Sequence, residues 1–336
     1  MKRALVISGG GSKGAFAVGV IRYLAVHYPA ITFDIIVGTS TGALIAPLTA
    51  AGEINLLVQL YTTVQTNDII SKGNVVNRLL SFNSLYDVSP VAKLITQYYT
   101  DRLCNNLLQS SKQIYLVTTC LQTSATVNFS NRLPSFSTAE TVNIIANAEE
   151  MRRAVLASAC QPVFMPPIEI RKGSIPLRQY VDGGLTEWAG LQLAIDAGAD
   201  EVYTILLTPA KKPPEEKTFN DAFSILEKTV DIFTDDVGAN DTGQPLAYNQ
   251  ALTYIALVKS RMLTAGVSQQ AIDTYFNIPG SPFSARKPLD LYIIRPDAPL
   301  GGGPGGLTFN PAEMKTMLAR GEARIAEFMA GGKKSF

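Results

Sequence analysis

The amino-acid sequence predicts an α/β protein in which helices cover a mostly parallel β-sheet. The first observation is the apolar run at 3–8 (RALVIS), which is followed by a glycine-rich turn and a helix-like segment over 14–28. The second is a repeat of this order, because the apolar run at 33–38 (FDIIVG) leads through a glycine turn into an alanine-rich helix. Strands that alternate with helices are typical of parallel sheets with helices on their faces.

The later segments continue this alternation. Residues 53–110 have mostly helical periodicity. Beyond them we expect a strand pair at 113–122 and 125–129 with a turn at Thr123–Ser124, a helix at 148–159, a strand at 178–184, a short helix at 189–198, strands at 201–207 and 290–296, a flexible glycine-rich loop at 301–307 and an amphipathic terminal helix. Short apolar runs bounded by glycine, proline or polar residues are typical of buried strands.

A proline- and charge-rich stretch at 209–217 (PAKKPPEEK) is the strongest linker signal in the chain. After it, apolar residues recur at helical spacing, which predicts one helix around 219–233 and a second over about 246–265. We therefore expect three parts: a core over 1–208, a helical insertion or cap over 209–287, and a returning strand with the terminal helix over 288–336, completing the core.

The composition bounds the classes of function. With 336 residues, 46% of them hydrophobic, and a net charge of +1, the chain can build a large core but has no basic excess for nucleic acid. A single histidine, and three cysteines without metal-ligand spacing, lead us to expect no metal. No signal-like run follows the first residues and no apolar run could span a bilayer, so we expect a cytoplasmic protein.

The motif GTSTG has the G-x-S-x-G pattern of a nucleophile elbow, with Gly38 and Gly42 on either side of Ser40. It stands between a predicted strand and a predicted helix, which is the context that such an elbow requires. Ser40 would then lie on a sharp turn at a helix N-terminus, where developing negative charge is favoured. A plain strand–helix turn that contains glycine and serine is the alternative.

A nucleophilic serine needs a base. His27 is the only histidine, and it lies near the end of the first predicted helix, roughly 20 Å beyond Gly14 at about 1.5 Å per residue. The base must therefore be a carboxylate or a lysine. Asp182 in YVDGG is the carboxylate candidate, because it ends a predicted strand and the carboxyl ends of parallel strands share one edge of a sheet. Gly183 and Gly184 permit a tight turn there, although most such tripeptides are simple turns.

The loop GGGSKG has the G-x-G-x-x-G spacing of a dinucleotide-binding fingerprint, and Asp34 follows at about the distance of a ribose-binding acid. That acid belongs at the carboxyl end of the second strand, whereas Asp34 stands at the beginning of its strand. Dinucleotide binding is therefore disfavoured.

A phosphate-binding P-loop is excluded, because Lys13 follows the serine of the loop instead of preceding it. What remains is a glycine-rich loop beside a nucleophile, with backbone N–H groups free to point at one spot, as an oxyanion hole requires. Lys13 would add positive charge or orient the loop, and a solvated surface lysine is the equal alternative.

Three motifs resemble, in order, the signatures of patatin-like phospholipases: GGGSKG (9–14), GTSTG (38–42) and DGG (182–184). Between the last two, ASACQPVFMPP (157–167) resembles the small-residue and proline block of that family. The resemblance covers about 1–52 and 150–200. It implies a three-layer α/β/α fold with a nucleophile elbow, and makes 1–208 the catalytic core.

The resemblance also implies a Ser–Asp dyad, with Ser40 as the nucleophile and Asp182 as the base. Cys160 and Gln161 depart from the family pattern, in which smaller residues are commoner at these positions. Cys160 has no histidine to activate it, so we interpret it as a packed thiol.

The oxyanion would be held by the backbone N–H groups of Gly10 and Gly11, with a contribution from Gly9 or Thr41. The other residues of the motifs support the two loops and the elbow: Lys13, Gly14, Gly38, Gly42, Gly183 and Gly184.

The resemblance thus implies a serine hydrolase that cleaves lipid acyl esters, as a phospholipase A or lysophospholipase, through an acyl-serine intermediate and without a cofactor. Its partner would be a lipid or acyl-ester substrate, with transient contact to a membrane surface and no nucleic acid. The alternatives are an acyltransferase or thioesterase with the same dyad, a non-catalytic lipid-binding or regulatory protein, and a nucleotide-binding module. The sequence indicates neither the head group nor the acyl-chain length of the lipid. It also indicates no activator and no oligomeric state.

Overall fold

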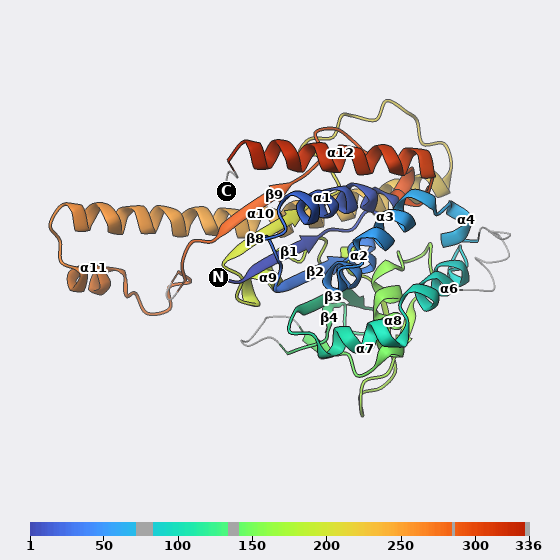
Figure 1. Cartoon of the computed structure of the whole chain (residues 1–336), viewed down its shortest axis with the longest axis horizontal. Helices are drawn as coiled ribbons and strands as arrows, with labels where there is room; N and C mark the ends of the chain where they lie inside the picture. Colours follow the sequence, from blue (N-terminus) through green and yellow to red (C-terminus); the bar gives the residue numbers. More distant parts are fainter. Residues whose placement is uncertain (72–82, 134–140, 284–285, 333–336) are drawn as a thin grey trace.

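The computed structural model describes residues 1–71, 83–133, 141–283 and 286–332 and is built around one mixed, mostly parallel sheet (Figure 1). Its main path runs in the order β5-β4-β3-β2-β1-β8-β9, and β7 pairs with both β3 and β6. The strands are β1 (Arg3–Ile7), β2 (Ile35–Thr39), β3 (Gln113–Cys120), β4 (Ala125–Ser130), β5 (Thr141–Ile144), β6 (Ile168–Ile170), β7 (Arg178–Asp182), β8 (Glu201–Ile205) and β9 (Asp290–Ile294). The central strands β3, β2, β1, β8 and β9 are parallel, as the sequence predicts.

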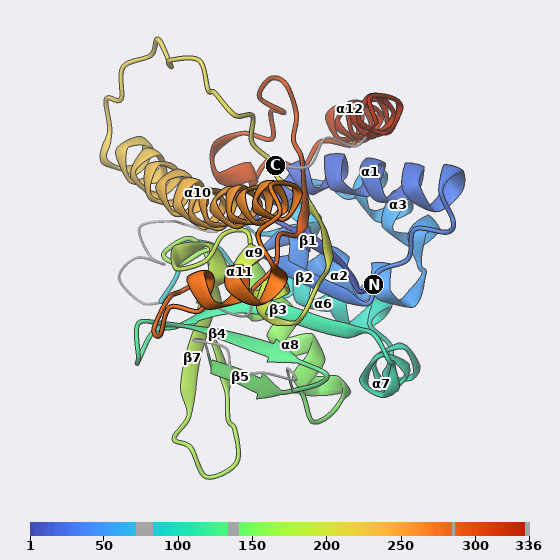
Figure 2. The ribbon, with the colours of Figure 1, turned by 90° about the vertical axis from the view of Figure 1, so that its left-hand side faces the viewer.

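Helices cover both faces of this sheet. They are α1 (Gly14–His27), α2 (Thr41–Ala51), α3 (Ile54–Thr63), α4 (Thr66–Ile69), α6 (Ser89–Tyr98), α7 (Asp101–Gln109), α8 (Ala148–Ala159), α9 (Leu191–Asp196), α10 (Ala222–Thr264), α11 (Gln269–Phe276) and α12 (Pro311–Ala330). Figure 2 shows α1 and α12 on one side of β1 and α10 on the other. The fold is therefore a three-layer α/β/α sandwich with helical C-terminal additions.

Strand β1 explains why the sheet is covered on both faces. Its four residues from Ala4 to Ile7 are fully buried. Because side chains alternate along a strand, Leu5 and Ile7 join the core cluster under α1, α2 and α12, whereas Ala4 and Val6 join the cluster under α9. An unbroken apolar run is thus needed to bury both faces of a central strand.

The 20-residue helix α12 returns to the N-terminal part of the chain and packs along α1. The two backbones approach closely because each helix has a glycine at the crossing. A Cβ on Gly19 would lie 2.0 Å from the carbonyl oxygen of Leu318, and one on Gly321 would lie 2.1 Å from that of Phe16. The helix α1, which is apolar nearly all round, is buried by this partner.

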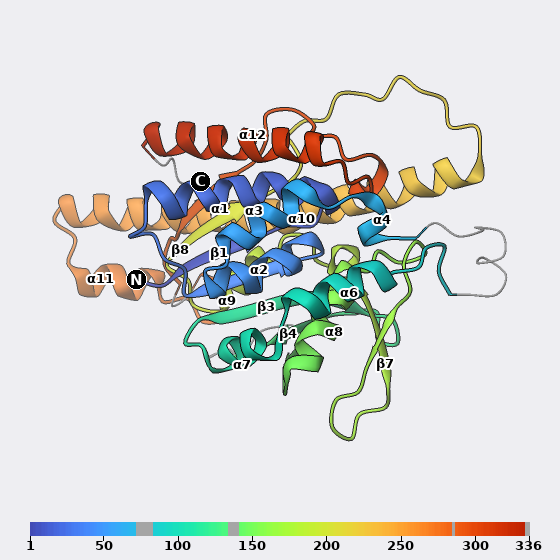
Figure 3. The ribbon, with the colours of Figure 1, turned by 45° about the vertical axis from the view of Figure 1, so that its right-hand side comes forward.

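The region after the linker differs from the prediction of two helices. It forms one continuous helix of 43 residues, α10, which contains Pro245 and begins only at Ala222. A proline inside a helix removes one backbone hydrogen bond and normally breaks or kinks the helix. Tertiary contacts hold α10 on both sides of the proline, because Asp241 accepts a hydrogen bond from the Trp188 amide and Asn249 exchanges two hydrogen bonds with the backbone of Leu289. Figure 3 shows α10 running across the molecule, with its C-terminal end and α11 extending beyond the sheet.

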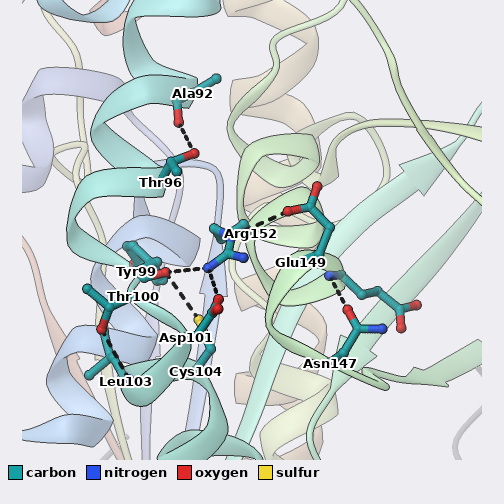
Figure 4. A network of polar contacts seen from close by, with 11 residues as sticks. Ala92, Thr96, Tyr99, Thr100, Asp101, Leu103, Cys104, Asn147, Glu149 and Arg152 are labelled. Atoms are coloured by element: carbon teal, nitrogen blue, oxygen red, sulfur yellow. Dashed lines mark hydrogen bonds and ion pairs between the residues drawn. The ribbon is translucent and has the colours of Figure 1, made fainter.

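A polar network joins α6, α7 and α8 (Figure 4). Arg152 on α8 donates hydrogen bonds to the carbonyl of Tyr99 at 2.8 Å and to the carboxylate of Asp101 at 2.9 Å. The Tyr99 hydroxyl in turn donates to the carbonyl of Leu44 on α2 at 2.5 Å. The network therefore holds α8 and α2 in a defined relation, and both helices contribute to the site described next.

The division into core, insertion and completing segment remains a prediction, although β9 does pair with β8 in the sheet. Within the described ranges, no helix combines the length and the apolar character needed to cross a bilayer.

Candidate active site

Ser40 lies on the sharp turn between β2 and α2. Its backbone has φ 57° and ψ −122°, a conformation that is strained for any residue with a side chain. The flanking glycines are required by close packing, since a Cβ on Gly38 would lie 2.2 Å from the carbonyl oxygen of Gly42, and one on Gly42 would lie 2.1 Å from that of Ile7. The G-x-S-x-G pattern therefore reflects a tight strand–turn–helix with the serine at its apex.

The strained turn is held from a distant part of the chain. The backbone N–H of Ser40 donates to the hydroxyl of Ser158 at 3.0 Å, and this hydroxyl donates to the carbonyl of Val117 at 2.6 Å. Ser158 is fully buried near the end of α8. No local pattern predicts this role of Ser158, and the resemblance of the block ASACQPVFMPP to the family is the one signal that includes it.

Asp182 at the end of β7 is buried and lines one pocket with Ser40, whose side chain lies close enough to lower the pKa of Asp182. The carboxylate oxygen Oδ1 of Asp182 accepts a 2.8 Å hydrogen bond from the backbone N–H of Gly184. Burial raises the pKa of Asp182 from 3.8 to about 6, and the side chain of Ser40 and the hydrogen bond from Gly184 oppose this rise. A buried carboxylate that titrates near neutrality is suited to accept a proton from a hydroxyl.

The strand that carries Asp182 runs in the direction opposite to the one our argument assumed. We expected both residues at carboxyl ends of parallel strands, but β7 is antiparallel to β3. The two residues meet because β7 pairs only with the last residues of β3, which places Asp182 opposite Thr118. On the same edge of β3, Thr39 at the end of β2 lies opposite the neighbouring residue Val117, whereas β4 occupies the other edge. The end of β7 is therefore level with the end of β2.

The glycine loop between β1 and α1 lies beside this pair, because a Cβ on Gly9 would approach the Cβ of Ser40 to 3.1 Å. The N–H of Gly9 donates to the backbone carbonyl of Trp188 at 3.4 Å, so it is engaged within the fold. Gly10 has φ 151° and Gly11 has φ 58°, conformations that favour glycine. Within the part of the chain that the structure describes, the N–H groups of Gly10 and Gly11 have no acceptor.

A second glycine segment, GGGPGG at 301–306, packs against this first loop. A Cβ on Gly306 would lie 2.2 Å from the carbonyl oxygen of Gly10, and one on Gly11 would lie 2.2 Å from the carbonyl oxygen of Gly306. We expected a flexible loop here, but Gly302 and Gly306 are buried and the segment contains the 3₁₀ turn η3 (Pro304–Gly306). The C-terminal part of the chain thus supports the loop that lies beside Ser40.

Ser40 and Asp182 line one pocket together with all three glycines of the first loop. Part of its wall is apolar and comes from several elements: Leu44, Ile69, Val91, Met165, Leu307 and Phe309. Another part is charged: Lys13, Lys212, Asp231 and Asp235. An apolar wall beside a polar, reactive end is typical of sites for small amphipathic ligands.

Other candidate residues lie away from the chemistry. His27 is exposed at the end of α1, where its ring lies against Tyr23, and Asp34 accepts a hydrogen bond from the backbone of Arg3 at the start of β2. Cys160 is fully buried, and burial raises the pKa of its thiol, so it is a packed thiol as expected. Among the described residues, no group of three or more histidine, cysteine, aspartate or glutamate side chains is placed to hold a metal ion.

The fold and the site together define a three-layer α/β/α protein with a serine and a buried carboxylate paired in one pocket. The chain belongs to the patatin-like phospholipase family, whose sequence profile matches residues 5–195. It is similar to the cUMP-AMP-activated phospholipase of Escherichia coli, with 41% identity over 64 residues, which cover 18% of this chain and 20% of that protein. The match thus spans about a fifth of that relative's length. VipD from Legionella pneumophila superimposes with a TM-score of 0.46 and 13% identity over 100% of this chain and 68% of that one.

Proposed function

We propose that the protein hydrolyses acyl esters of lipids, as a phospholipase A or lysophospholipase, with Ser40 as the nucleophile and Asp182 as the base. The observation that carries the proposal is that Ser40, at the apex of its strained turn, and the buried carboxylate of Asp182 line one partly apolar pocket. Membership of the patatin-like phospholipase family supports a lipid ester as the substrate class. No cofactor or metal takes part in this mechanism.

In the first half of the reaction, the Oγ of Ser40 attacks the ester carbonyl carbon while its proton passes to the carboxylate of Asp182. The carbonyl oxygen becomes an oxyanion, and the N–H groups of Gly10 and Gly11 donate to it. Such donors contribute most when they are already aimed before the reaction, and loss of one typically lowers the rate on the order of 100–1000-fold. Collapse of the intermediate releases the alcohol, which takes the proton from Asp182, and leaves an acyl group on Ser40.

In the second half, Asp182 accepts a proton from water, and the resulting hydroxide attacks the acyl-serine carbonyl. The same backbone donors hold the second oxyanion. The fatty acid leaves, and the proton on Asp182 returns to Ser40. The pKa of about 6 at Asp182 suits both roles, because a general acid–base group works best when its pKa lies near the working pH.

We propose that the 209–287 part forms a wall of this pocket. Val230 and Thr234 on α10 line it, and Gly238 one turn further lies against the Trp188 ring. The same helix therefore contacts both the core and the substrate space. The segment 288–336 would complete the core through β9 and α12.

We also propose that the outer side of α10 contacts a membrane surface transiently. Ile225, Ile232 and Phe233 are 51%, 55% and 62% exposed, and the last two lie between the α10 residues that line the pocket without lining it themselves. Sedimentation with phospholipid vesicles should decrease for the double variant Ile232→Ser/Phe233→Ser. Tyr254→Ser, on an exposed residue further along α10, is the matched control; an equal loss for both variants would contradict the proposal.

The central test is product analysis by mass spectrometry with a panel of lipid esters. Wild type should release free fatty acid, and Ser40→Ala should release none while keeping its circular dichroism and melting temperature. A fluorophosphonate probe should label Ser40 in the wild type, and Ser89→Ala, on an exposed helix terminus, should be labelled equally. Acyl groups found on an added alcohol would instead favour an acyltransferase, faster thioester cleavage a thioesterase, and absence of labelling a non-catalytic lipid-binding protein.

A further inference from the structure

Four charged side chains line the same pocket as Ser40 but take no part in the proposed chemistry. Lys13 lies on the 3₁₀ turn η1 (Gly11–Lys13), and Lys212 lies in the segment between β8 and α10. Asp231 and Asp235 lie four positions apart on α10, so they share one face of the helix. Only Lys13 falls inside the part of the chain that matches the family profile. The other three are supplied by the region that follows it.

Two of these charges neutralise each other. The Nζ of Lys212 lies 2.5 Å from each carboxylate oxygen of Asp235. Both side chains are about two-fifths exposed, at 42% and 41%, so this pair lies at the solvent side of the pocket. Exposed pairs of this kind contribute little to folding stability.

The other two charged residues, Lys13 and Asp231, affect each other electrostatically without direct contact. Burial lowers the pKa of the Lys13 ammonium, and the charge of Asp231 opposes that shift. Burial likewise raises the pKa of Asp231, and Lys13 is the first of the charges that oppose it. Within the described residues, no hydrogen bond or ion pair at contact distance is found for the side chain of Lys13 or of Asp231. Both residues are half-buried. Partial withdrawal of two charges from water without direct partners is unfavourable, and a ligand that pairs with both would offset that cost.

We propose that Lys13 and Asp231 form a head-group subsite for a zwitterionic glycerophospholipid, with Lys13 binding a phosphate oxygen and Asp231 binding the ammonium group. This inference rests on the proposed function, because it concerns the substrate of the Ser40–Asp182 pair. The four charges sum to zero, so the subsite matches a head group with separated charges and no net charge. An anionic head group would face two carboxylates, and an uncharged glyceride would leave both Lys13 and Asp231 without a partner.

The chemistry of the subsite also favours one kind of ammonium. A primary ammonium donates hydrogen bonds to carboxylates, whereas a quaternary ammonium is typically held against aromatic faces. Asp231 supplies the carboxylate acceptor that a primary ammonium uses. The preferred substrate class is therefore a phosphoethanolamine lipid rather than a phosphocholine lipid.

The test compares kcat/KM for four lipids with identical acyl chains in uncharged detergent micelles: phosphatidylethanolamine, phosphatidylcholine, phosphatidylglycerol and diacylglycerol. The full chain should prefer phosphatidylethanolamine to phosphatidylglycerol by about tenfold or more, as expected for one hydrogen-bonded charge pair. Asp231→Asn should remove this preference, and Asp231→Lys should reverse it towards phosphatidylglycerol. Lys13→Met should lower kcat/KM for phosphatidylethanolamine to about the value for diacylglycerol.

Asp236→Asn is the matched control, because Asp236 is an exposed carboxylate on the same helix that does not line the pocket. It should keep the wild-type ratios. The subsite would be overturned if Asp231→Asn kept the wild-type ratio of kcat/KM between phosphatidylethanolamine and phosphatidylglycerol, or if the wild type had no head-group preference. Neither result would contradict the proposed hydrolase activity. Failure of the wild type to cleave even a soluble butyrate ester would instead refute the proposed function, and the subsite with it.

Discussion

The backbone N–H of Ser40 donates a 3.0 Å hydrogen bond to the hydroxyl of Ser158, which belongs to a helix more than a hundred residues away in the sequence. Ser40 has φ 57°, so its backbone does not adopt this conformation for local reasons. Ser158 also donates to the carbonyl of Val117 in β3. It therefore fixes the position of the proposed nucleophile relative to the sheet, without touching the substrate.

Ser158→Ala is expected to lower kcat for a soluble ester while changing KM little, because the turn that presents Ser40 loses its anchor. It should also lower the free energy of unfolding by about 1–3 kcal/mol, since a buried N–H and a buried carbonyl lose their partner. Ser84→Ala is the control, because Ser84 is another buried serine that donates to a backbone carbonyl, away from the pocket. If both variants lose stability and both keep kcat, Ser158 has a purely structural role.

The pH dependence of catalysis should follow Asp182. Its carboxylate must be ionised to accept the proton of Ser40, and its pKa is raised to about 6. We expect kcat/KM for a soluble ester to increase with pH up to about 6 and to level off above it, over a series from about pH 4.5 to about pH 9. His27→Gln should leave this profile unchanged, because His27 is exposed at the far end of α1. A midpoint that moves in His27→Gln would contradict the assignment of the base.

The same shift has a consequence for stability. A carboxyl whose pKa rises from 3.8 to about 6 on folding is ionised more easily in the unfolded chain, so the folded state loses stability as pH rises through that window. At about 1.4 kcal/mol per pKa unit, the loss is on the order of 3 kcal/mol. Asp182→Asn cannot ionise and should be inactive yet more stable than the wild type at pH 8 by urea unfolding. The difference should shrink near pH 4, and a difference that does not depend on pH would contradict it.

A substitution in the second glycine segment, at 301–306, should lower kcat and change KM little. A Cβ on Gly306 would lie 2.2 Å from the carbonyl oxygen of Gly10, so Gly306→Ala must displace the proposed oxyanion loop. We expect kcat to fall by roughly 100-fold or more, similar to loss of an oxyanion donor, with a small change in KM.

Gly280→Ala separates this effect from backbone strain. Gly280 has φ +76°, close to the +73° of Gly306, but nothing lies within 4 Å of its added Cβ. Both variants should therefore lose roughly 1–2 kcal/mol of stability from the unfavourable φ, and Gly306→Ala should lose more because its Cβ displaces the Gly10 loop. Only Gly306→Ala should lose rate. A comparable fall in kcat for both, measured well below their melting temperatures, would show that Gly306 has no special role.

Much of the fold was predictable because its signals are local. The apolar runs of β1 and β2 and the glycine turns after them predicted a helix-covered parallel sheet, since period and turn chemistry act over a few residues. The single helix α10 was not predictable in the same way. Pro245 is a strong local signal for a break in the helix. It is outweighed by the contacts of α10 with Trp188 and by the helical turns of α10 that precede the proline.

The candidate site likewise has some features with local sequence signals and others that depend on distant parts of the chain. The G-x-S-x-G turn at Ser40, the two glycine motifs and the exclusion of a histidine base follow from the residues alone, because they depend on residue type and on sterics within one turn. Three other relations emerge only in the folded chain: β7 is antiparallel and still brings Asp182 to Ser40, Ser158 anchors the turn, and Gly306 supports Gly10. These relations depend on strand register and on close approach of distant segments. Both are decided by packing of the whole core, and neither is encoded in any short stretch of the chain.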